Sequence, residues 1–468
     1  MQTDLELAFE MLTAKKPLYD KYFNYYDGKA PLIYSRERLR DIFASINARF
    51  TQNWCAVVID SLLERLSLMQ FVIAENEADT EFINREWQLS DMALDADDAH
   101  LTALVTGEAY VIAWKEEGEP ATAYYNDPRN VHLFYSGDNP RRKRFACKWW
   151  VGDDDHRYLT LYYPDRLEYY RSANSIAKTT VATGTLVIAK DVQTAASFGE
   201  PLIAANPYGE IPVFHLRRES RTIKSELTNI IEIQDSINKL LSDMMVAAEY
   251  GAFKQRWVIS QVDVRGKFKN SPDEIWAIPA GDGEGQQTSV GEFTPTELGN
   301  YLSAVEQMVQ SVAVISRTPK HYFLAQGGDP SGEALIAMEA PLNKKAQKYI
   351  DRFSSTWRKV AQFMLKLEGK EIDELDITAT FDRPETVQPM TNATIRKTNV
   401  EAGIPLTTQL RDEGWTQQEL DDMQEDKETE QASNKAGLGA ALLNAQAGFD
   451  RGNQNGNEDV TDDEDVNA

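Results

Sequence analysis

The segment Arg317-Thr-Pro-Lys-His-Tyr-Phe-Leu-Ala-Gln-Gly-Gly-Asp-Pro-Ser331 separates two long stretches whose apolar residues recur at helical spacing. The stretch before it covers residues 295–316, and the one after it continues to about residue 368. An irregular insert, residues 251–294, separates the first of these from a further helical stretch at 223–250. Two helices around a small insert, then a loop and a third helix, predict rods that line a wall or a channel. The arrangement does not favour an enclosed small-molecule site.

Each of the first two predicted helices carries an apolar stripe at alternating spacings of three and four. The stripe residues are Leu227, Ile230, Ile237, Leu241 and Met244 in the first helix, and Leu302, Val305, Val309 and Val312 in the second. A stripe near 3.5 residues per turn predicts a neighbouring helix at a shallow angle, in the same chain or in another copy. Gln234 interrupts the first stripe.

The ends of the second and third predicted helices carry local signals. Thr294, Pro295 and Glu297 have the spacing of a capping box with proline in the first turn. Asp329 is the predicted N-cap of the third helix, and Pro341 inside that helix predicts a kink.

The chain before residue 223 divides into a helical and a β part. Helices are expected within residues 1–70, including 53–68, and again at 79–91. From about residue 108 to 216, aromatic and β-branched runs alternate with Gly-, Asn-, Asp- and Pro-containing turns, which predicts an antiparallel β meander. Residues 377–381 predict a further strand, and a capping box at 416–419 opens another helix. The predicted fold class is therefore α+β.

The net charge of −25 is unevenly distributed. Residues 411–430 hold nine acidic and two basic residues, and residues 452–468 hold six acidic residues and no basic one. This excess of acidic residues disfavours a protein that binds DNA tightly through its phosphates, because such affinity comes from Lys and Arg. It is compatible with a surface that DNA must pass without sticking. The Gly-, Asn- and Asp-rich residues 432–468 predict a disordered acidic tail.

The sequence offers no recognisable catalytic centre. It has no P-loop, no Gly-x-Ser-x-Gly motif and no His pair at helical spacing for zinc, and Cys55 and Cys147 are its only cysteines. The Gly-rich run at 281–285 and the Asp-rich run at 153–156 favour solvated turns over phosphate or metal sites. We therefore expect no enzymatic activity, cofactor or metal. No signal peptide or membrane-spanning run is expected either, so synthesis in the cytoplasm and no membrane contact are predicted.

Two features keep a functional and a structural interpretation open. Lys344, Lys348 and Arg352 share one face of the third helix, which is either a solvated or intersubunit face or a sparse row of cations beside DNA. The loop containing Lys320 and His321 is long for a helix–helix connection, so it is either a plain linker or a functional loop.

Seven segments of the sequence together resemble one known family. They are, in order, Tyr25-Tyr26-Asp27-Gly28; Asn53-Trp-Cys-Ala-Val-Val-Ile-Asp60; Thr106-Gly-Glu-Ala-Tyr-Val111; Asn206-Pro-Tyr-Gly-Glu-Ile-Pro-Val-Phe214; Ser225 to Glu249 with Gln234-Asp235 and Asn238-Lys239; Gly328-Asp-Pro-Ser-Gly-Glu-Ala-Leu335; and Gly403-Ile404-Pro405 followed by Gly414 and the Glu419 helix. In their order and spacing they resemble the portal proteins of tailed double-stranded DNA phages, in the branch with long non-contractile tails.

The resemblance implies a portal fold with named parts. These are a mixed α/β wing at 1–222, two stem helices at 223–250 and 295–316, and a small α/β clip at 251–294 that contains Trp257 and Trp276. A tunnel loop at 317–332, a long kinked helix at 333–368, a returning wing strand at 369–395 and a helical crown at 396–431 follow. Residues 432–468 would form the tail.

The resemblance also implies a function. Portal proteins form a ring, usually a dodecamer, at one capsid vertex of the virion. The ring is the channel for DNA packaging and ejection. Its partners would be double-stranded DNA bound without sequence preference, the terminase large subunit, a head-completion or adaptor protein, and the major capsid protein with its scaffold. Lys320, His321, Tyr322 and Phe323 would project into the bore, with Lys344, Lys348 and Arg352 beside it.

Two rival functions were weighed against the portal interpretation. A metal-dependent nuclease or other head enzyme would need a cluster of acidic and His residues at defined spacing, which the sequence lacks. A non-portal structural virion protein, such as a tail or baseplate component with a helical stalk, would share the long helices but would not form a wide ring.

Overall fold

The computed structural model describes residues 2–29, 31, 52–176, 178–180, 186–188, 194–219, 222–252, 256–259, 289–294, 296–323, 331–384, 389–412, 415 and 420–429. The chain divides into two compact units, Met1–Thr386 and Val387–Ala468. The first unit mixes helices and antiparallel sheets, and the second is helical where it is described, so the fold class is α+β as predicted. Among the described residues, no helix combines the length and the apolar character needed to cross a bilayer.

Helix α1 (Asp4–Tyr26) begins with a capping box formed by Thr3 and Glu6. It runs through the aromatic residues that precede the Asp27–Gly28 turn, where Gly28 adopts a φ of 69°. Helix α3 (Trp54–Leu63) ends five residues before the predicted boundary at Leu68. Leu68 instead begins strand β1 (Leu68–Ile73), which pairs antiparallel with β14 (Ile377–Phe381). The predicted strand at 377–381 therefore closes a sheet with the N-terminal part of the unit.

Helices α4 (Glu77–Leu89) and α5 (Met92–Thr106) follow β1. The first matches the predicted helix at 79–91 within two residues. The second was not predicted, because α5 is buried on most of its circumference and so has no single apolar stripe. Helix α5 ends at Gly107, whose φ of 99° lies in the left-handed region.

The β region forms two sheets in place of the single predicted meander. Strands β2 (Glu108–Trp114), β3 (Thr122–Asn126) and β11 (Val213–Arg217) form one sheet in the order β11-β2-β3. The second sheet, in the order β10-β7-β6-β5-β4, contains β4 (Val131–Tyr135), β5 (Lys143–Val151), β6 (Arg157–Tyr162), β7 (Arg166–Arg171) and β10 (Leu202–Ala205). A short pair, β8 (Lys178–Thr180) and β9 (Leu186–Ile188), lies between β7 and β10 in the sequence.

The break between the two sheets lies at the turn after Asn126. The Asp127 carbonyl accepts hydrogen bonds from the backbone N–H groups of Asn130 and Val131. The guanidinium of Arg129 binds the Asp127 carboxylate at 2.6 Å and that of Asp20 on α1 at 2.9 Å. This tight turn sends β4 into the second sheet, so it does not pair with β3.

A buried carboxylate, Glu108, joins α1 to both sheets. It accepts hydrogen bonds from Tyr19 and Lys15 of α1 and, at 2.8 Å, from His215 of β11. Burial by itself would raise the pKa of Glu108, but the hydrogen bond from His215 and the charge of Lys15 hold it well below its ordinary value. Lys15 also contacts His132 of β4 at 2.8 Å, and burial lowers the pKa of His132 to about 3. The Glu108–Lys15 ion pair therefore lies buried at the junction of α1, β2, β4 and β11.

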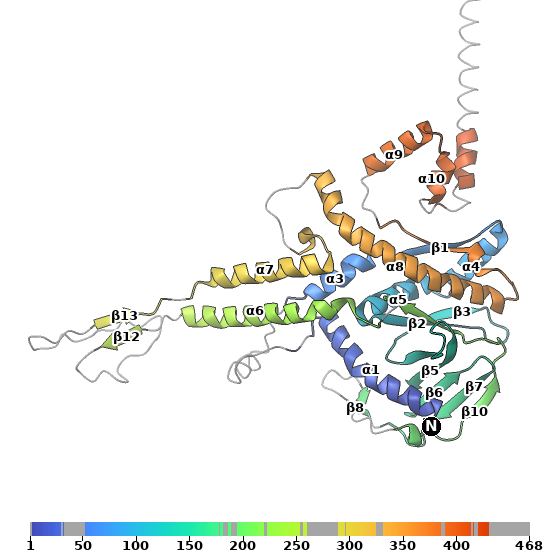
Figure 1. The fold of residues 1–468 in the computed structure, drawn as a ribbon, viewed down its shortest axis with the longest axis horizontal. Coiled ribbons are helices and arrows are strands. Elements are labelled where there is room, and N and C mark those ends of the chain that lie inside the picture. The colour runs from blue at the N-terminus through green and yellow to red at the C-terminus, as the bar shows by residue number, and fades with distance from the viewer. Residues whose placement is uncertain are drawn as a thin grey trace, which may run out of the picture. The chain divides into compact units, whose positions relative to one another are not determined.

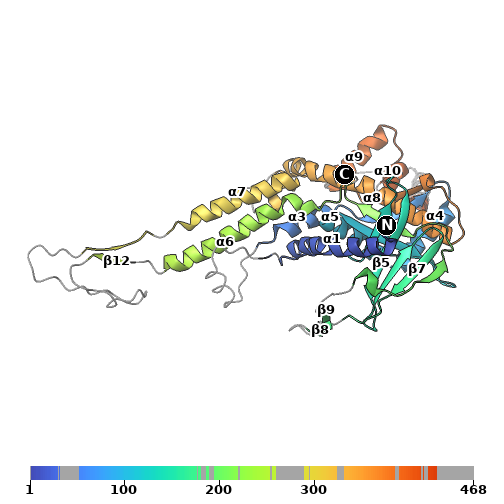
Figure 2. The ribbon, with the colours of Figure 1, turned by 60° about the horizontal axis from the view of Figure 1, so that its bottom comes forward.

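Two long helices, α6 (Ile231–Ala252) and α7 (Leu298–Ser316), lie side by side and project away from the sheets (Figures 1 and 2). At the far end of the pair, β12 (Arg256–Ile259) and β13 (Ser289–Glu292) pair antiparallel. Helix α6 starts later than predicted, because residues 226–229 form the 3-10 turn η2 (Glu226–Asn229). Helix α7 begins at Leu298 with Glu297 as N-cap and no side-chain cap, so the predicted capping box at Thr294 does not form. Pro295 lies outside the described residues.

The predicted stripe residues of α6 and α7 differ in burial. Leu227, Ile230, Ile237, Val305, Val309 and Val312 are all buried. Leu241 and Met244 are partly buried, whereas Leu302 is 50% exposed. The exposed apolar residues of α7 also include Leu298, Val314 and Ile315. Leu298 and Leu302 lie on the same side of α7 as the buried stripe, whereas Val314 and Ile315 lie on other sides. The described residues of a single chain therefore leave apolar side chains of α7 uncovered on more than one side.

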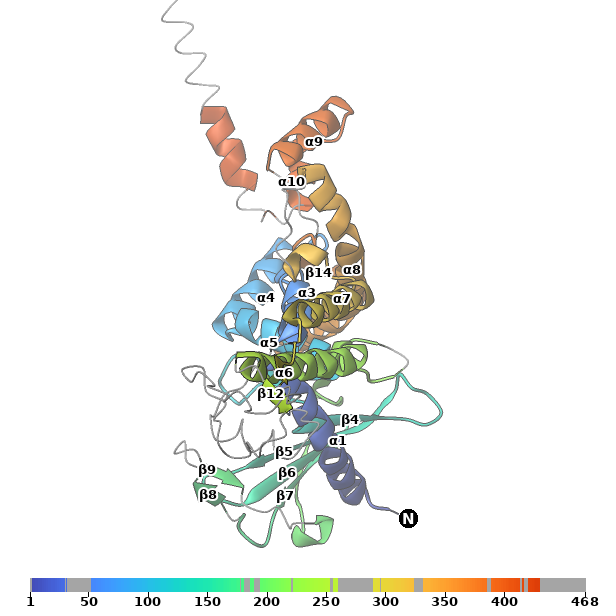
Figure 3. The same ribbon diagram turned by 90° about the vertical axis from the view of Figure 1, so that its left-hand side faces the viewer.

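Helix α8 (Gly332–Leu367) crosses the first unit and packs on β14 and β11 (Figure 1). Its N-cap is Ser331, whose hydroxyl accepts a hydrogen bond from the Ala334 N–H; the predicted cap, Asp329, lies outside the described residues. The helix is continuous through Pro341, and Figure 1 shows it changing direction near its N-terminal end. Viewed along α6 and α7, α4 lies on one side of the unit and α8 on the other (Figure 3).

The second unit contains α9 (Pro389–Glu401) and α10 (Leu406–Asp412). They are joined by a turn at Gly403, with a φ of 94°. The Gln409 side chain closes the turn by donating to the Ile404 carbonyl at 3.1 Å. Residues 420–429 are helical, while the predicted capping box at 416–419 and the acidic tail at 432–468 lie outside the described residues.

Gly107 provides a test of the α5–β2 junction. A Cβ atom there would lie 2.7 Å from the backbone nitrogen of Lys224, in addition to the cost of its positive φ. We expect Gly107→Ala to lower the free energy of unfolding by about 3 kcal/mol or more, measured by denaturant titration. Gly118→Ala is the matched control, because Gly118 has a φ of 86° and open space around it. Equal losses in the two variants would contradict the proposed backbone clash.

Candidate functional site

The predicted tunnel loop begins with a short ordered turn. Helix α7 is capped by Arg317, which adopts a φ of 62°, and the Thr318 N–H donates to the Ala313 carbonyl. The 3-10 turn η3 (Lys320–Tyr322) follows. Lys320 is exposed and His321 is partly exposed, whereas residues 324–330 lie outside the described part of the chain. The loop therefore leaves α7 in a fixed direction with Lys320 at the surface.

Arg65, in the turn after α3, connects η3 to α8. Its Nε donates to the Asn343 side chain at 2.8 Å, and its Nη2 donates to the Tyr322 hydroxyl at 3.0 Å. The same guanidinium lies 3.4 Å from the Glu339 carboxylate, which His321 approaches at 3.5 Å from the other side. Arg65 and Glu339 are only 9% and 10% exposed, so the contacts are made in a largely desolvated setting.

Phe323 does not project from the loop as expected. It is 6% exposed, and its ring centroid lies 5.6 Å from that of Trp54 at the start of α3. Tyr322 is partly buried and held by Arg65. Burial of the Phe323 ring stabilises the loop base, because apolar area removed from water contributes about 25 cal/mol per Å². Of the four predicted bore residues, Lys320 and His321 are the two still available for outside contact.

The start of α6 is tied to α8 through Glu226. Its carboxylate forms ion pairs with Lys345 of α8 and with Arg218, the latter at 2.8 Å, and it accepts a 2.7 Å hydrogen bond from the Tyr349 hydroxyl. Lys345 also donates at 2.7 Å to the carbonyl of Ser316, the last residue of α7. Burial lowers the pKa of Lys345, while Glu226 opposes that shift. One lysine therefore joins the ends of both projecting helices to α8.

Gln234, which interrupts the apolar stripe of α6, anchors α3. Its side-chain oxygen accepts the Trp54 N–H at 2.9 Å, and its side-chain nitrogen donates to the Gln52 carbonyl at 2.5 Å. Asn238 accepts the Gln52 N–H at 3.2 Å, and Asp235 accepts the Tyr25 hydroxyl at 2.8 Å. Gln234 and Asn238 thus satisfy backbone groups at the N-terminus of α3, which would otherwise lack partners, while Asp235 ties α6 to α1. The polar residues within the α6 stripe thus form hydrogen bonds that fix α6 to α3 and α1.

The predicted basic face of α8 divides into two parts. Lys344 and Lys348 are exposed, and neither forms an ion pair with a described residue. Arg352 is also exposed, but its guanidinium donates to the Arg218 carbonyl and lines a hollow with Arg217 and Lys359. Lys344 and Lys348 therefore remain candidates for outside contact, while Arg352 belongs to a different surface.

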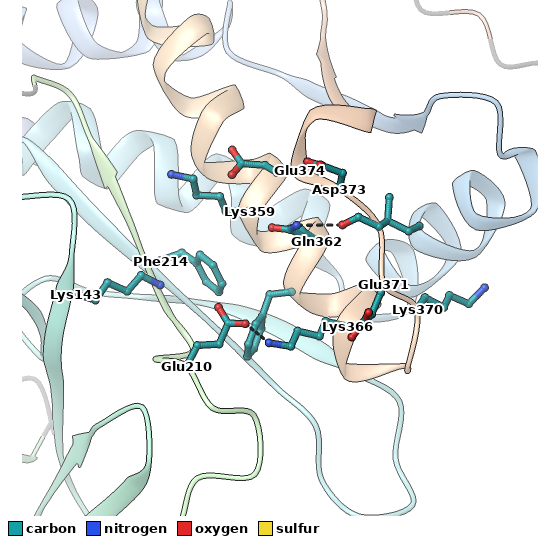
Figure 4. A pocket seen from close by; sticks show the side chains of 12 residues that line it. Lys143, Glu210, Phe214, Lys359, Gln362, Lys366, Lys370, Glu371, Asp373 and Glu374 are labelled. Carbon is teal, nitrogen blue, oxygen red and sulfur yellow. Dashed lines mark hydrogen bonds and ion pairs between the residues drawn. The ribbon is translucent and has the colours of Figure 1, made fainter.

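The hollows of the first unit do not bring together groups for catalysis. The hollow in Figure 4, about 620 Å³ between α8 and the segments around Glu210 and Phe214, is lined mainly by Lys, Glu, Asp and Gln side chains. Lys366 pairs with Glu210 across it, and Gln362 donates to the Ile372 carbonyl at 3.0 Å. No group of His, Cys, Asp and Glu suited to a metal occurs within the described residues. Cys55 and Cys147 are buried, and burial raises the pKa of each thiol to about 12, so both remain as thiols.

Of the two predicted clip tryptophans, only Trp257 lies in the described part. It is on β12, partly buried, and pairs with Gly291 of β13. A Cβ atom at Gly291 would come within 2.4 Å of the indole, so the ring lies directly over the backbone of the opposite strand. Trp276 and the Gly-rich turn at 281–285 lie outside the described residues.

Residues 9–433 match a family model described as phage portal protein, SPP1 Gp6-like. The chain belongs to the phage portal protein family. Two relatives are each named portal protein: that of Mycobacterium phage L5 is 22% identical over 411 residues, and that of Mycobacterium phage D29 is 23% identical over 423 residues. The matches cover 84% of this chain in both cases, and 80% and 81% of the relatives.

A portal protein is a component of the phage virion, so the family match confirms the resemblance seen in the sequence and does not favour a tail or baseplate component. A chain in a solved structure of the virion of a native gene transfer agent particle is also similar, with 10% identity and a TM-score of 0.42. That similarity covers 80% of this chain and 91% of the other.

Sequence reasoning missed Arg65, Glu339 and Asn343, which hold the base of the predicted tunnel loop. The only sequence signal for these residues was their position. Arg65 interrupts the apolar run after the helix at 53–63, and Glu339 and Asn343 lie four residues apart, on one face of a helix. Nothing in their spacing says that the two segments meet.

The Arg65 contacts generate a prediction about the loop base. Arg65→Ala removes a guanidinium that lies 3.4 Å from the largely buried Glu339 carboxylate and also bonds Asn343 and Tyr322, so we expect a loss of about 3 kcal/mol in the free energy of unfolding. Arg65→Lys keeps the positive charge but lacks the planar guanidinium that binds several partners at once. It should therefore recover only part of the free energy of unfolding lost in Arg65→Ala. Arg142→Ala, which removes an exposed pair with Asp138, should cost far less. If Arg65→Ala were as stable as Arg142→Ala in denaturant titrations, the guanidinium would not hold the loop base.

Proposed function

We propose that this portal protein forms a closed ring, a dodecamer in the virion, at one vertex of the capsid. The ring serves as the channel for DNA packaging and ejection. The terminase large subunit docks on it during packaging, and a head-completion or adaptor protein docks later. The major capsid protein and its scaffold would surround it. The chain is made in the host cytoplasm, acts without a cofactor and has no enzymatic activity of its own.

The observation that supports a ring is the exposure of apolar side chains on α7. Leu302 is 50% exposed although it lies on the same face as the buried Val305 and Val309, and Val314, on another side of the helix, is 70% exposed. Exposed apolar residues on a long helix are typical of a helix–helix contact with another copy. In a ring of parallel stems, the α6–α7 pair of a neighbouring copy would cover these side chains.

The parts of the chain have proposed roles in that ring. Residues 1–222 with 369–395 form the wing, α6 and α7 the stem, and 251–294 the clip, where β12 and β13 gain partners from neighbouring copies. The tunnel loop at 317–332 and the long helix at 333–368 face the channel. Residues 396–431 form the crown, followed by the acidic tail.

Assembly can be tested on the purified chain. We expect mass photometry and negative-stain images to show a particle of ring mass with a central hole, because the exposed apolar side chains of α7 need a partner. Leu302→Glu should reduce the ring fraction, since it puts a charge into that contact. Leu375→Glu is the control, because Leu375 is 79% exposed outside the stem. A chain that stays monomeric at high concentration and inside the virion would overturn the proposal.

Lys320, His321, Lys344 and Lys348 are proposed to lie beside the DNA. A few exposed cations on an acidic protein give shallow phosphate contacts that do not trap a sliding duplex. This arrangement requires that the four side chains stay accessible in the ring.

Charge reversal tests the channel assignment. We expect Lys344→Glu/Lys348→Glu to shorten the packaged genome or reduce its retention while rings still form, because two phosphate contacts per copy become repulsive. The control is Lys16→Glu/Lys21→Glu, which makes the same charge change on exposed positions of α1. Packaged DNA of unchanged length, measured by gel electrophoresis of virion DNA, would count against these residues as channel-lining cations.

A further inference from the structure

Five cations gather on one flank of the first unit. Arg141, Lys143, Arg217, Arg352 and Lys359 line a hollow of about 560 Å³, in which Asp351 is the sole acidic lining residue. We call this set the cationic groove. None of the five forms an ion pair with a carboxylate in the described part of the chain. Such a concentration of uncompensated cations is unexpected on a protein with a net charge of −25.

The groove is built and held by specific contacts. Lys143 donates to the Ile211 carbonyl at 3.0 Å and lies 4.3 Å from the Phe214 ring. Arg217 lies over the Tyr135 ring at 5.2 Å, and Arg352 donates to the Arg218 carbonyl. Figure 4 shows Lys143 and Lys359 reaching toward the same space beside Phe214. Burial lowers the pKa of Lys143 to about 8, with Glu210 opposing and Lys359 adding to that shift. An anionic partner in the groove would relieve this repulsion.

A complementary surface lies at the junction of α4 and α5. Asp91, Asp97 and Asp98 are exposed there, and none of them pairs with a described cation. Burial, with the neighbouring charge of Asp98, raises the pKa of Asp97. Two large apolar side chains lie among these acids, Leu89 at 64% and Leu94 at 72% exposure. We call these five residues the acidic flank. An apolar pair within uncompensated acids is typical of a protein contact surface.

The two surfaces lie on opposite sides of the unit. Viewed along the stem, α4 and α5 are on one side, while α8 and β4 are on the other (Figure 3). A closed ring joins copies through heterologous contacts, in which one surface of each copy meets a different surface of the next. A contact between the two surfaces requires that, in a ring of parallel stems, these two sides face the neighbouring copies.

We propose that the cationic groove of one copy receives the acidic flank of the next copy, and that this contact sets the order of subunits around the ring. The inference rests on the ring proposed above and adds the surfaces that meet. Charge complementarity suppresses wrong pairings, such as groove to groove, and raises the association rate between strongly acidic chains. Leu89 and Leu94 would be covered by the aromatic rings that line the groove. Arg352 then serves assembly, and not the DNA channel.

A charge swap tests the contact. Arg352→Glu/Lys359→Glu and Asp97→Lys/Asp98→Lys should each raise the protein concentration needed for half-maximal ring formation by tenfold or more at low salt. The combination of all four changes should recover most of that loss, because each new charge meets its opposite again. Mass photometry measures the ring fraction, and circular dichroism confirms that each variant is folded. Lys16→Glu/Lys21→Glu is again the control for a change in net charge.

Several outcomes would overturn the contact. Reversals that leave ring formation unchanged would do so, as would a four-fold variant that assembles no better than the two double variants. Loss of binding to double-stranded DNA in Arg352→Glu/Lys359→Glu, with normal rings, would assign the groove to phosphates. None of these results would contradict the proposal that the unaltered chain forms a ring. Failure of the unaltered chain to form any ring would instead overturn the proposed function.

Discussion

The position of helices α6 and α7 depends on one cluster of charges, in which Glu226 is paired with Lys345 and Arg218. Lys345 reaches the end of α7 through the Ser316 carbonyl and the segment just before α6 through Glu226, so both helices are fixed to a single turn of α8. The three charged side chains are each less than 15% exposed. Breaking such a cluster is costly because the remaining charges stay buried, which makes the angle between the α6–α7 pair and α8 strongly specified.

The same principle recurs wherever two parts of the first unit meet. Glu108 joins α1 to both sheets, Arg65 joins α3 to α8, and Gln234 joins α6 to α3. In each case a polar side chain in an otherwise apolar region forms hydrogen bonds with polar groups of a segment that is distant in the sequence. Apolar packing supplies the bulk of the stability in these regions, whereas the polar joints specify which segments meet and at what angle.

The sequence predicted best those elements that have one buried face. The stem helices, the strands of the β region, the strand at 377–381 and the long helix all have such a face, and each occurs close to its predicted position. Helix α5 was missed because its second half, from Ala99 to Thr106, is buried nearly all round and so has no single apolar stripe. The division into two sheets was missed because it depends on Arg129 reaching Asp20, a contact between residues far apart in the chain.

For the candidate site, the sequence located the loop but not the direction of its side chains. The resemblance implied that Phe323 projects into the bore, yet Phe323 packs on Trp54, which no local pattern around residue 323 could indicate. The apolar stripe of α7 was predicted without its partner, and Leu302 remains exposed in the single chain. The family was recognisable all the same, because its signal is spread over most of the length.

Strand β1 pairs with β14, and Leu68 is matched to Phe381. During synthesis β1 emerges about 300 residues before its partner, which at typical translation rates is a delay of roughly 15 to 60 seconds. Throughout that time the β1 edge lacks the partner that it has in the folded chain. A chain whose translation ends before residue 377 lacks β14 and cannot complete the sheet, so its β1 edge stays open to pairing with another strand.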